Sequence, residues 1–252
     1  PFVLRRTKKE VITELPDKIE QNMILPFSDE EEKIYVANLA KVNEELQQLY
    51  DIEGSDKMQI LKMLTRLRQL CLEPRLVYDN IDQPSSKLKA CMELIKTMQE
   101  NKQKVLLFSS FTSALDLIAE ECQKAGITYY MLTGSTNKEE RRELVSRFQK
   151  DDTTLFLISL KAGGTGLNLT SAENVIHYDP WWNVSAQNQA TDRAYRIGQK
   201  SNVQVFNLVM KDSVEEKIIE MQKRKKELAD MFVENNSGGL SQMRSEERRV
   251  GK

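Results

Sequence analysis

The sequence predicts an α/β fold in which a parallel sheet carries helices on both faces, with a helical insertion before the sheet and a C-terminal helix after it. Two observations carry this prediction. Between residues 85 and 211, short apolar runs alternate with helical patterns of about 10–15 residues, which is typical of right-handed βαβ units around a buried sheet. Before residue 85, the apolar residues recur at helical spacing instead.

Residues 1–26 are the first expected segment, a connector with a basic cluster that reads as a short helix followed by extended chain. Residues 27–84 are the expected helical insertion. Ser28 and Glu31 form a capping box at the start of its first helix, and its second amphipathic helix ends before Pro74. The expected turn and linker are residues 54–56 and 82–86.

Residues 85–211 contain the expected sheet. The predicted strands are 104–109, 128–132, 154–159, 174–178 and 203–209. The predicted helices are 87–100, 113–124, one capped by Thr136 with Glu139 that runs to Lys150, and one that ends at Gly198. Residues 212–243 are expected to be a helix, opened by a capping box of Ser213 with Glu216, and a flexible end.

Composition excludes several classes of protein. The chain has 252 residues, 37 basic and 38 acidic, so bulk charge alone would not hold it on nucleic acid, although a local basic face fits the count. No apolar run approaches the ~20 residues of a membrane span, and we expect no membrane partner. Three cysteines without C-x-x-C spacing and a single histidine argue against a zinc site or a disulfide framework, and favour a reducing compartment.

Residues 244–252, RSEERRVGK, match the translation of a common sequencing adapter. We expect them to be an artefact rather than a charged tail, and we leave them out of the fold prediction. Without their four basic and two acidic side chains, 33 basic and 36 acidic residues leave a net charge of −3.

Small polar residues follow four of the predicted strands. They are Ser109–Thr112, Thr133–Thr136, Ser159–Gly166 and Asp179–Asn183. Because the carboxyl ends of parallel strands share one edge of a sheet, these residues predict a surface where backbone N–H and hydroxyl groups receive phosphates. Helix N-capping is the alternative for part of the Ser and Thr residues. The glycines beside Lys161 allow close backbone approach or simply make a turn, and no G-x-x-x-x-G-K-[ST] motif occurs.

The stretch QNQATDRAYRIGQ, residues 187–199, carries two arginines. On a helix, Gln189, Arg193 and Arg196 share one face, from which two guanidinium groups can clamp phosphate oxygens. The alternative is a solvated face on which Asp192 pairs with an arginine.

Several motifs occur in an order that resembles the second lobe of Swi/Snf-type helicase-like ATPases. They are KVLLFSSFTSALDLI, LTGSTNKEERRELVSRFQ, LISLKAGGTGLNLTSAENVIHYDPWWN and QNQATDRAYRIGQ, preceded by PFVLRRTKKEVITELPDKIE, which resembles the passage from the first lobe to the second. The resemblance covers roughly residues 1–236 and implies a RecA-like lobe of an ATP-driven translocase on double-stranded DNA. Leu160, Val184 and Tyr195 depart from residues frequent in chromatin remodellers and favour a bacterial branch.

The resemblance also implies roles for individual residues. Arg193 and Arg196 match arginine fingers that reach the γ-phosphate of ATP, which is bound with Mg mainly by an N-terminal RecA-like lobe in cis. The implied nucleotide-site residues are Gly164, Gly166, Gln189 and Asp192. The implied DNA-binding residues are Ser110, Phe111, Thr112, Gly134, Ser135, Thr136, Lys161, Gly163 and Trp182. No residue is implied as a metal ligand, and without Walker A and B motifs the chain alone is expected to be inactive.

Two alternatives stay open. The chain could be a non-catalytic interaction module, docking a partner through residues 217–226, or a lobe of a single-strand nucleic-acid helicase. The pairing of WWN with RIGQ argues against the second. We expect a cytoplasmic, nucleoid-associated protein if the source is bacterial and a nuclear protein if it is eukaryotic.

Overall fold

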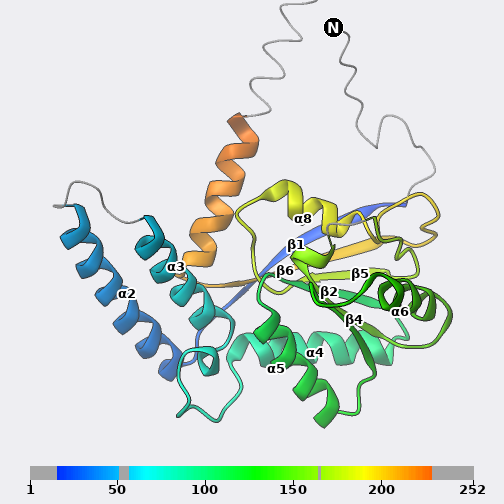
Figure 1. Ribbon diagram of the computed structural model, residues 1–252, viewed down its shortest axis with the longest axis horizontal. Helices are drawn as coiled ribbons and strands as arrows, with labels where there is room; N and C mark the ends of the chain where they lie inside the picture. Colours follow the sequence, from blue (N-terminus) through cyan, green and yellow to red (C-terminus); the bar gives the residue numbers. More distant parts are fainter. Residues whose placement is uncertain (1–15, 51–56, 164–165, 229–252) are drawn as a thin grey trace, which may run out of the picture.

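The computed structural model describes residues 16–50, 57–163 and 166–228, and these form a six-stranded, fully parallel sheet with helices around it (Figure 1). The strands lie in the order β1-β6-β5-β2-β4-β3. They are β1 (Lys18–Leu25), β2 (Val105–Ser109), β3 (Tyr129–Leu132), β4 (Leu155–Ser159), β5 (Asn174–His177) and β6 (Val203–Met210). The predicted parallel sheet is therefore confirmed, with five of its strands within one or two residues of their predicted bounds.

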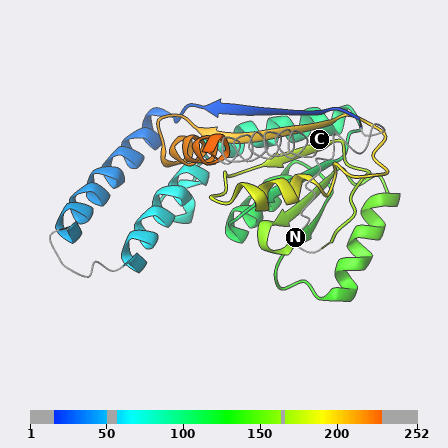
Figure 2. The ribbon, with the colours of Figure 1, turned by 90° about the horizontal axis from the view of Figure 1, so that it is seen from above.

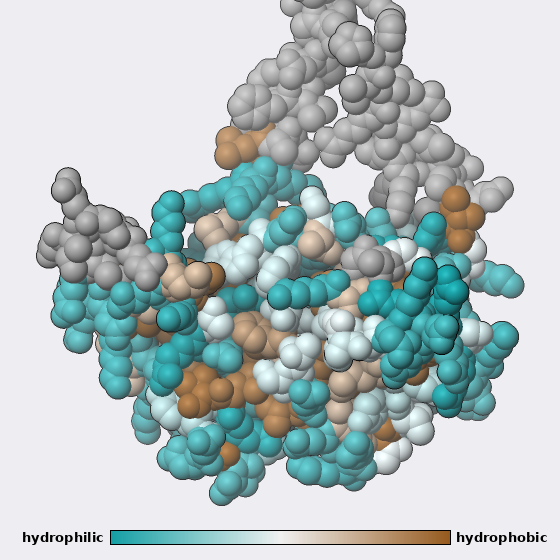
Figure 3. Space-filling model, in the orientation of Figure 1, coloured by the Kyte–Doolittle hydropathy of each residue, from teal (hydrophilic) through white to brown (hydrophobic). Residues whose placement is uncertain are grey.

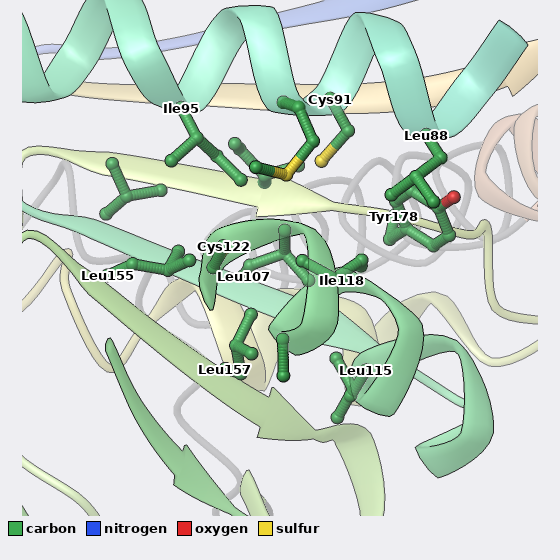
Figure 4. Close-up of a cluster of buried hydrophobic side chains, with 14 of the residues drawn as sticks. Leu88, Cys91, Ile95, Leu107, Leu115, Ile118, Cys122, Leu155, Leu157 and Tyr178 are labelled. Atoms are coloured by element: carbon green, nitrogen blue, oxygen red, sulfur yellow. The ribbon is translucent and has the colours of Figure 1, made fainter. Parts of the chain in front are cut away.

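Two apolar clusters flank the sheet. One face is covered by α4 (Ser86–Glu100) and α5 (Thr112–Lys124), whose side chains pack on alternate residues of β2 and β4. Figure 4 shows this cluster, with Cys91 and Ile95 of α4 facing Leu107 and Leu157 of the strands. The other face is covered by α6 (Lys138–Lys150), the short α7 (Leu160–Gly163) and α8 (Val184–Thr191). Burial of both faces explains why the strands read as continuous apolar runs.

The helical insertion is a hairpin of α2 (Asp29–Tyr50) and α3 (Lys57–Leu72), followed by the 3₁₀ turn η1 (Pro74–Leu76). Figures 1 and 2 show the hairpin standing to one side of the sheet, at the end where β1 and β6 finish. Its own apolar cluster includes Met210, the last residue of β6. The Ser28–Glu31 capping box is confirmed, because each backbone N–H donates to the other residue's side chain, at 2.7 and 3.4 Å.

The expected connector contains a strand that the sequence did not predict. Residues 18–25 are β1, an edge strand that pairs with β6 along its whole length. The lobe therefore includes this segment rather than beginning at residue 85. The short helix expected before it and the turn at 54–56 lie outside the described residues.

Three predicted helix boundaries are wrong: the end of one helix and the N-terminal caps of two others. Helix α8 ends at Thr191 rather than Gly198, and residues 192–198 are turns. Helix α6 is capped by Asn137, whose side chain accepts from the N–H of Glu140, while the Thr136 hydroxyl accepts from the N–H of Thr133. The capping box predicted at the C-terminal helix is not formed as expected. The side chain of Glu216 accepts from the N–H of Asp212, not from the N–H of Ser213.

The C-terminal helix runs from 214 to 228 in the part that the structure describes. A buried ion pair anchors its start, because the ammonium of Lys87 on α4 donates to both carboxylate oxygens of Glu215 at 2.6 and 2.7 Å. Among the described residues, no helix combines the length and the apolar character that a membrane crossing requires.

Candidate functional site

The loops that follow β5, β2, β4 and β3 lie along one edge of the sheet, because these four strands are adjacent and parallel. All the residues predicted to bind DNA belong to these loops, to the start of α5 or to the short α7. Thr112, Gly134, Ser135 and Lys161 are exposed there. We call this surface the carboxyl edge.

Asp179, after β5, organises the centre of the carboxyl edge. Its carboxylate is 1% exposed and accepts from the Ser109 hydroxyl at 2.7 Å and from the Ser110 N–H at 2.9 Å. The Ser110 hydroxyl also donates to it. These bonds tie the loop after β5 to the loop after β2, which carries Phe111.

Arg68 of α3 supplies the counter-charge. Its guanidinium Nη2 donates to Asp179 at 2.7 Å and to the Ser110 hydroxyl at 2.9 Å, although Arg68 itself is only 6% exposed. Arg68 was not predicted from the sequence. The available signal was an arginine among the apolar positions of an amphipathic helix, next to the buried Leu67.

Trp181 and Trp182 follow Asp179, and both are half-buried. The backbone of Trp181 is held on two sides: its N–H donates to Gln187 of α8 at 3.3 Å, and its carbonyl accepts from Gln222 of the C-terminal helix. Asn183 then caps α8, its side chain accepting from the N–H of Ser185 at 3.0 Å. Thus Trp182 lies between two fixed backbone positions and is only half-buried.

The loops after β3 and β4 lie beside a basic hollow. Its volume is about 750 Å³, and Lys138, Arg141 and Arg142 of α6 line it together with Thr136 and Gly166. Hydrophilic side chains gather over α6 on the face seen in Figure 3. These three basic residues were not predicted from the sequence. Gly164 lies outside the described residues, and Gly166 has a φ of +30° that favours glycine.

The predicted nucleotide-site residues are not presented by one continuous helix. Gln189 is exposed on α8, and Asp192 is its C-cap. Arg193 is half-buried and Arg196 is exposed, both on the turns that follow. Burial, together with the charge of Arg196, lowers the pKa of Arg193, while Asp192 opposes the shift. The prediction that Gln189, Arg193 and Arg196 share one face of a helix is therefore wrong, because both arginines lie on the turns after α8. Their action on a phosphate group stays a prediction.

His177, the last residue of β5, is buried and structural. Its Nε2 is 2.9 Å from the Thr191 hydroxyl, which itself donates to the Gln187 carbonyl, so the histidine donates through Nε2. Its Nδ1 has no partner among the described residues. Burial lowers the pKa of His177 to about 4 despite the opposing charges of Glu20 and Asp179.

Protonation of His177 is therefore expected to destabilise the fold. The pKa of His177 in the folded state lies below the unfolded value of about 6.5. The contribution of the neutral imidazole to the free energy of unfolding is therefore complete above pH 6.5 and is lost as pH falls toward 4. We expect a loss of about 2 kcal/mol between pH 7.5 and 5. The chain has one histidine, so one imidazole resonance in a proton NMR titration reports this pKa. A midpoint near 6.5 in the folded chain would contradict the prediction.

Arginine and glycine residues in this part of the chain suit an anionic ligand. Arg193, Arg196 and the exposed Gly166 offer cations and close backbone approach. Within the described ranges, no group of three or more His, Cys, Asp and Glu residues is placed to hold a metal ion.

Comparison with known proteins identifies relatives across most of the chain. Residues 86–198 match the helicase conserved C-terminal domain, and residues 1–76 match the SNF2-related domain. The chain is 36% identical to an uncharacterized ATP-dependent helicase of Mycoplasma pneumoniae, over 98% of this chain and 24% of the relative. It is 38% identical to the putative ATP-dependent helicase/translocase YwqA of Bacillus subtilis, over 94% of this chain and 26% of the relative.

A solved structure is also similar, the SWI2/SNF2 ATPase core of Sulfolobus solfataricus in complex with dsDNA. Its TM-score is 0.71 at 34% identity, covering 90% of this chain and 49% of that chain. The fold is thus the RecA-like α/β fold of SWI2/SNF2 ATPase C-terminal domains. The chain spans about a quarter of the length of the curated relatives it matches.

Proposed function

The chain belongs to the SNF2-related family of helicase-like ATPases, and on that premise we propose that it is the C-terminal lobe of an ATP-driven translocase on double-stranded DNA. The observation that carries the proposal is the carboxyl edge. Loops from four adjacent strands bring hydroxyl groups, backbone N–H groups, Lys161 and a half-buried tryptophan to one surface.

This surface suits the DNA backbone rather than the bases. Ser135, Thr136 and Lys161 lie at loop and helix starts, where N–H groups and hydroxyls receive phosphate oxygens without reading sequence. The basic hollow beside α6 adds positive charge next to Thr136. Local charge of this kind can hold a duplex even though the chain as a whole is close to neutral.

The chemical step requires a second lobe. ATP with Mg would be held mainly by an N-terminal RecA-like lobe, and from this chain Arg193 and Arg196 would stabilise charge on the transferring γ-phosphoryl group. Gln189, Asp192 and Gly166 would line the same cleft. Closing the cleft moves one lobe against the other while the carboxyl edge keeps its grip on the DNA, so each cycle of hydrolysis becomes a step.

The proposal is tested by comparing the chain with a longer protein that includes a first lobe. The 252-residue chain alone should not hydrolyse ATP with or without DNA, because it has no G-x-x-x-x-G-K-[ST] motif. The longer protein should be stimulated by duplex more than by single strands and should displace a DNA triplex. Stimulation by single strands alone would favour a single-strand helicase, and no stimulation by either would favour an interaction module. DNA-stimulated hydrolysis by the purified chain would contradict the assignment of the chemistry to two lobes.

A further inference from the structure

Arg68 connects the α2–α3 hairpin to the aromatic residues of the carboxyl edge. Its guanidinium carbon lies 4.9 Å from the centre of the Phe111 ring, 5.3 Å from that of Trp181 and 5.8 Å from that of Trp182. The three rings come from two loops, after β2 and after β5, which have no aromatic stacking with one another among the described residues. The arginine is thus the group that the rings share.

We propose that Arg68 is a positioning residue that sets the orientation of Phe111 and Trp182 for contact with the DNA duplex. The proposal rests on the proposed function for the role of these aromatic residues, but the arrangement itself belongs to the folded chain. Through α3, it makes the helical hairpin a structural part of the DNA-facing surface rather than an appendage beside it.

The geometry uses properties that arginine alone combines. One edge of the guanidinium is fixed by polar contacts, because Nη2 donates to Asp179, to Ser110 and, at 3.4 Å, to the carbonyl of Pro180. The flat faces remain available for aromatic rings, which attract the positive charge. A lysine ammonium could pair with Asp179, but it is a point charge without a flat face and would not hold rings from two loops in register.

Stability alone does not explain an arginine at this position. A buried ion pair contributes little net stability compared with well-packed apolar residues, whereas breaking one is costly. Arg68 also keeps a buried Nε without a hydrogen-bond partner among the described residues. The buried charge and the unsatisfied Nε both destabilise the fold. They occur at the point where the α2–α3 hairpin meets the loops after β2 and β5.

The two tryptophans of the chain allow a direct test, because both lie over Arg68 and the sequence contains no others. Arg68→Met should shift the tryptophan emission of the 252-residue chain and increase quenching by acrylamide at least twofold. Arg68→Lys should give an intermediate result. Arg66→Met is the matched control, because Arg66 lies on the same helix but contacts Asn38 and Tyr78 of the insertion, and it should leave both readings unchanged.

In the longer protein, Arg68→Met should raise the duplex concentration needed for half-maximal ATPase activity about tenfold, with KM for ATP unchanged. Trp182→Ala should have a similar effect, and the double variant should be little worse than either single variant, as expected for residues that act together. If Arg68→Met does not fold, Arg68→Lys carries the same comparison. Native tryptophan emission together with normal duplex dependence in folded Arg68 variants would overturn the proposal. Altered emission without any DNA-dependent ATPase, even in the unsubstituted protein, would overturn the proposed function while leaving the structural link intact.

Discussion

Replacing Arg196 by alanine in the longer protein is expected to lower kcat for DNA-dependent ATP hydrolysis by about 10³-fold or more. Arg196 is exposed on the turns after α8, with the half-buried Arg193 beside it. A guanidinium that meets the γ-phosphoryl group only when two lobes close stabilises the transition state and contributes little to DNA binding. Steady-state turnover at saturating ATP and duplex measures the loss, and a filter-binding or anisotropy titration should show DNA affinity largely kept.

Arg224→Ala is a suitable control for this prediction, because Arg224 is also an exposed arginine but lies on the C-terminal helix. It should leave kcat within a factor of two. Unchanged turnover in Arg196→Ala would remove Arg196 from the finger role, and a parallel loss of DNA affinity would place Arg196 at the DNA instead of at ATP.

The sequence predicted five of the six strands because they read as short apolar runs, and all of these strands but the edge strand β3 are buried almost throughout. β1 was missed for the opposite reason. Its residues KIEQNMIL are mostly exposed, even Ile19 at 52% and Ile24 at 48%, so no alternation marks a buried face. What makes it a strand is pairing with β6, about 185 residues away in sequence. Such long-range pairing leaves no local pattern.

The end of α8 was misplaced because tertiary contacts overrode helical propensity. A continuing helix would use the carbonyl of Arg193 within the helix, but that carbonyl accepts from the N–H of Leu169 at 3.0 Å. The Gln199 side chain takes the carbonyl of Ala194 at 3.2 Å. Ala194 and Tyr195 are then buried against the sheet, which leaves Ile197 70% exposed rather than packed beside them.

The carboxyl edge was predictable because the residues after parallel strands must share an edge, and this argument correctly places Ser110, Phe111 and Trp182 along it. Its central ion pair was not. Arg68 and Asp179 are 111 positions apart, and nothing in the local pattern of either residue indicates that the two pair. Only the packing of α3 against the end of the sheet brings them together.

Lys87→Met is expected to lower the free energy of unfolding by about 3–5 kcal/mol, the largest stability effect among these predictions. Lys87 is fully buried and Glu215 is 1% exposed, so the substitution leaves a carboxylate without its counter-charge. Glu215 would keep only the N–H of Met210, which donates to it at 2.8 Å. Urea unfolding of the 252-residue chain, followed by circular dichroism, measures the loss.

Two comparisons separate charge from packing in this prediction. Lys89→Met, an exposed position on the same helix, should change stability by less than about 0.5 kcal/mol. The double variant Lys87→Met with Glu215→Gln should recover much of the loss, because no buried charge remains.

The pH dependence of the Lys87→Met variant has a definite sign. Burial already raises the pKa of Glu215, and loss of Lys87 should raise it further. A carboxyl whose pKa is raised in the folded state binds its proton more tightly there than in the unfolded chain. Its contribution to the free energy of unfolding is therefore kept at low pH and lost as pH rises through the folded pKa. The destabilisation in Lys87→Met should therefore be smaller at pH 5 than at pH 8. An equal loss at both values, with no recovery in the double variant, would mean that Lys87 acts through the packing of its aliphatic chain rather than through its charge.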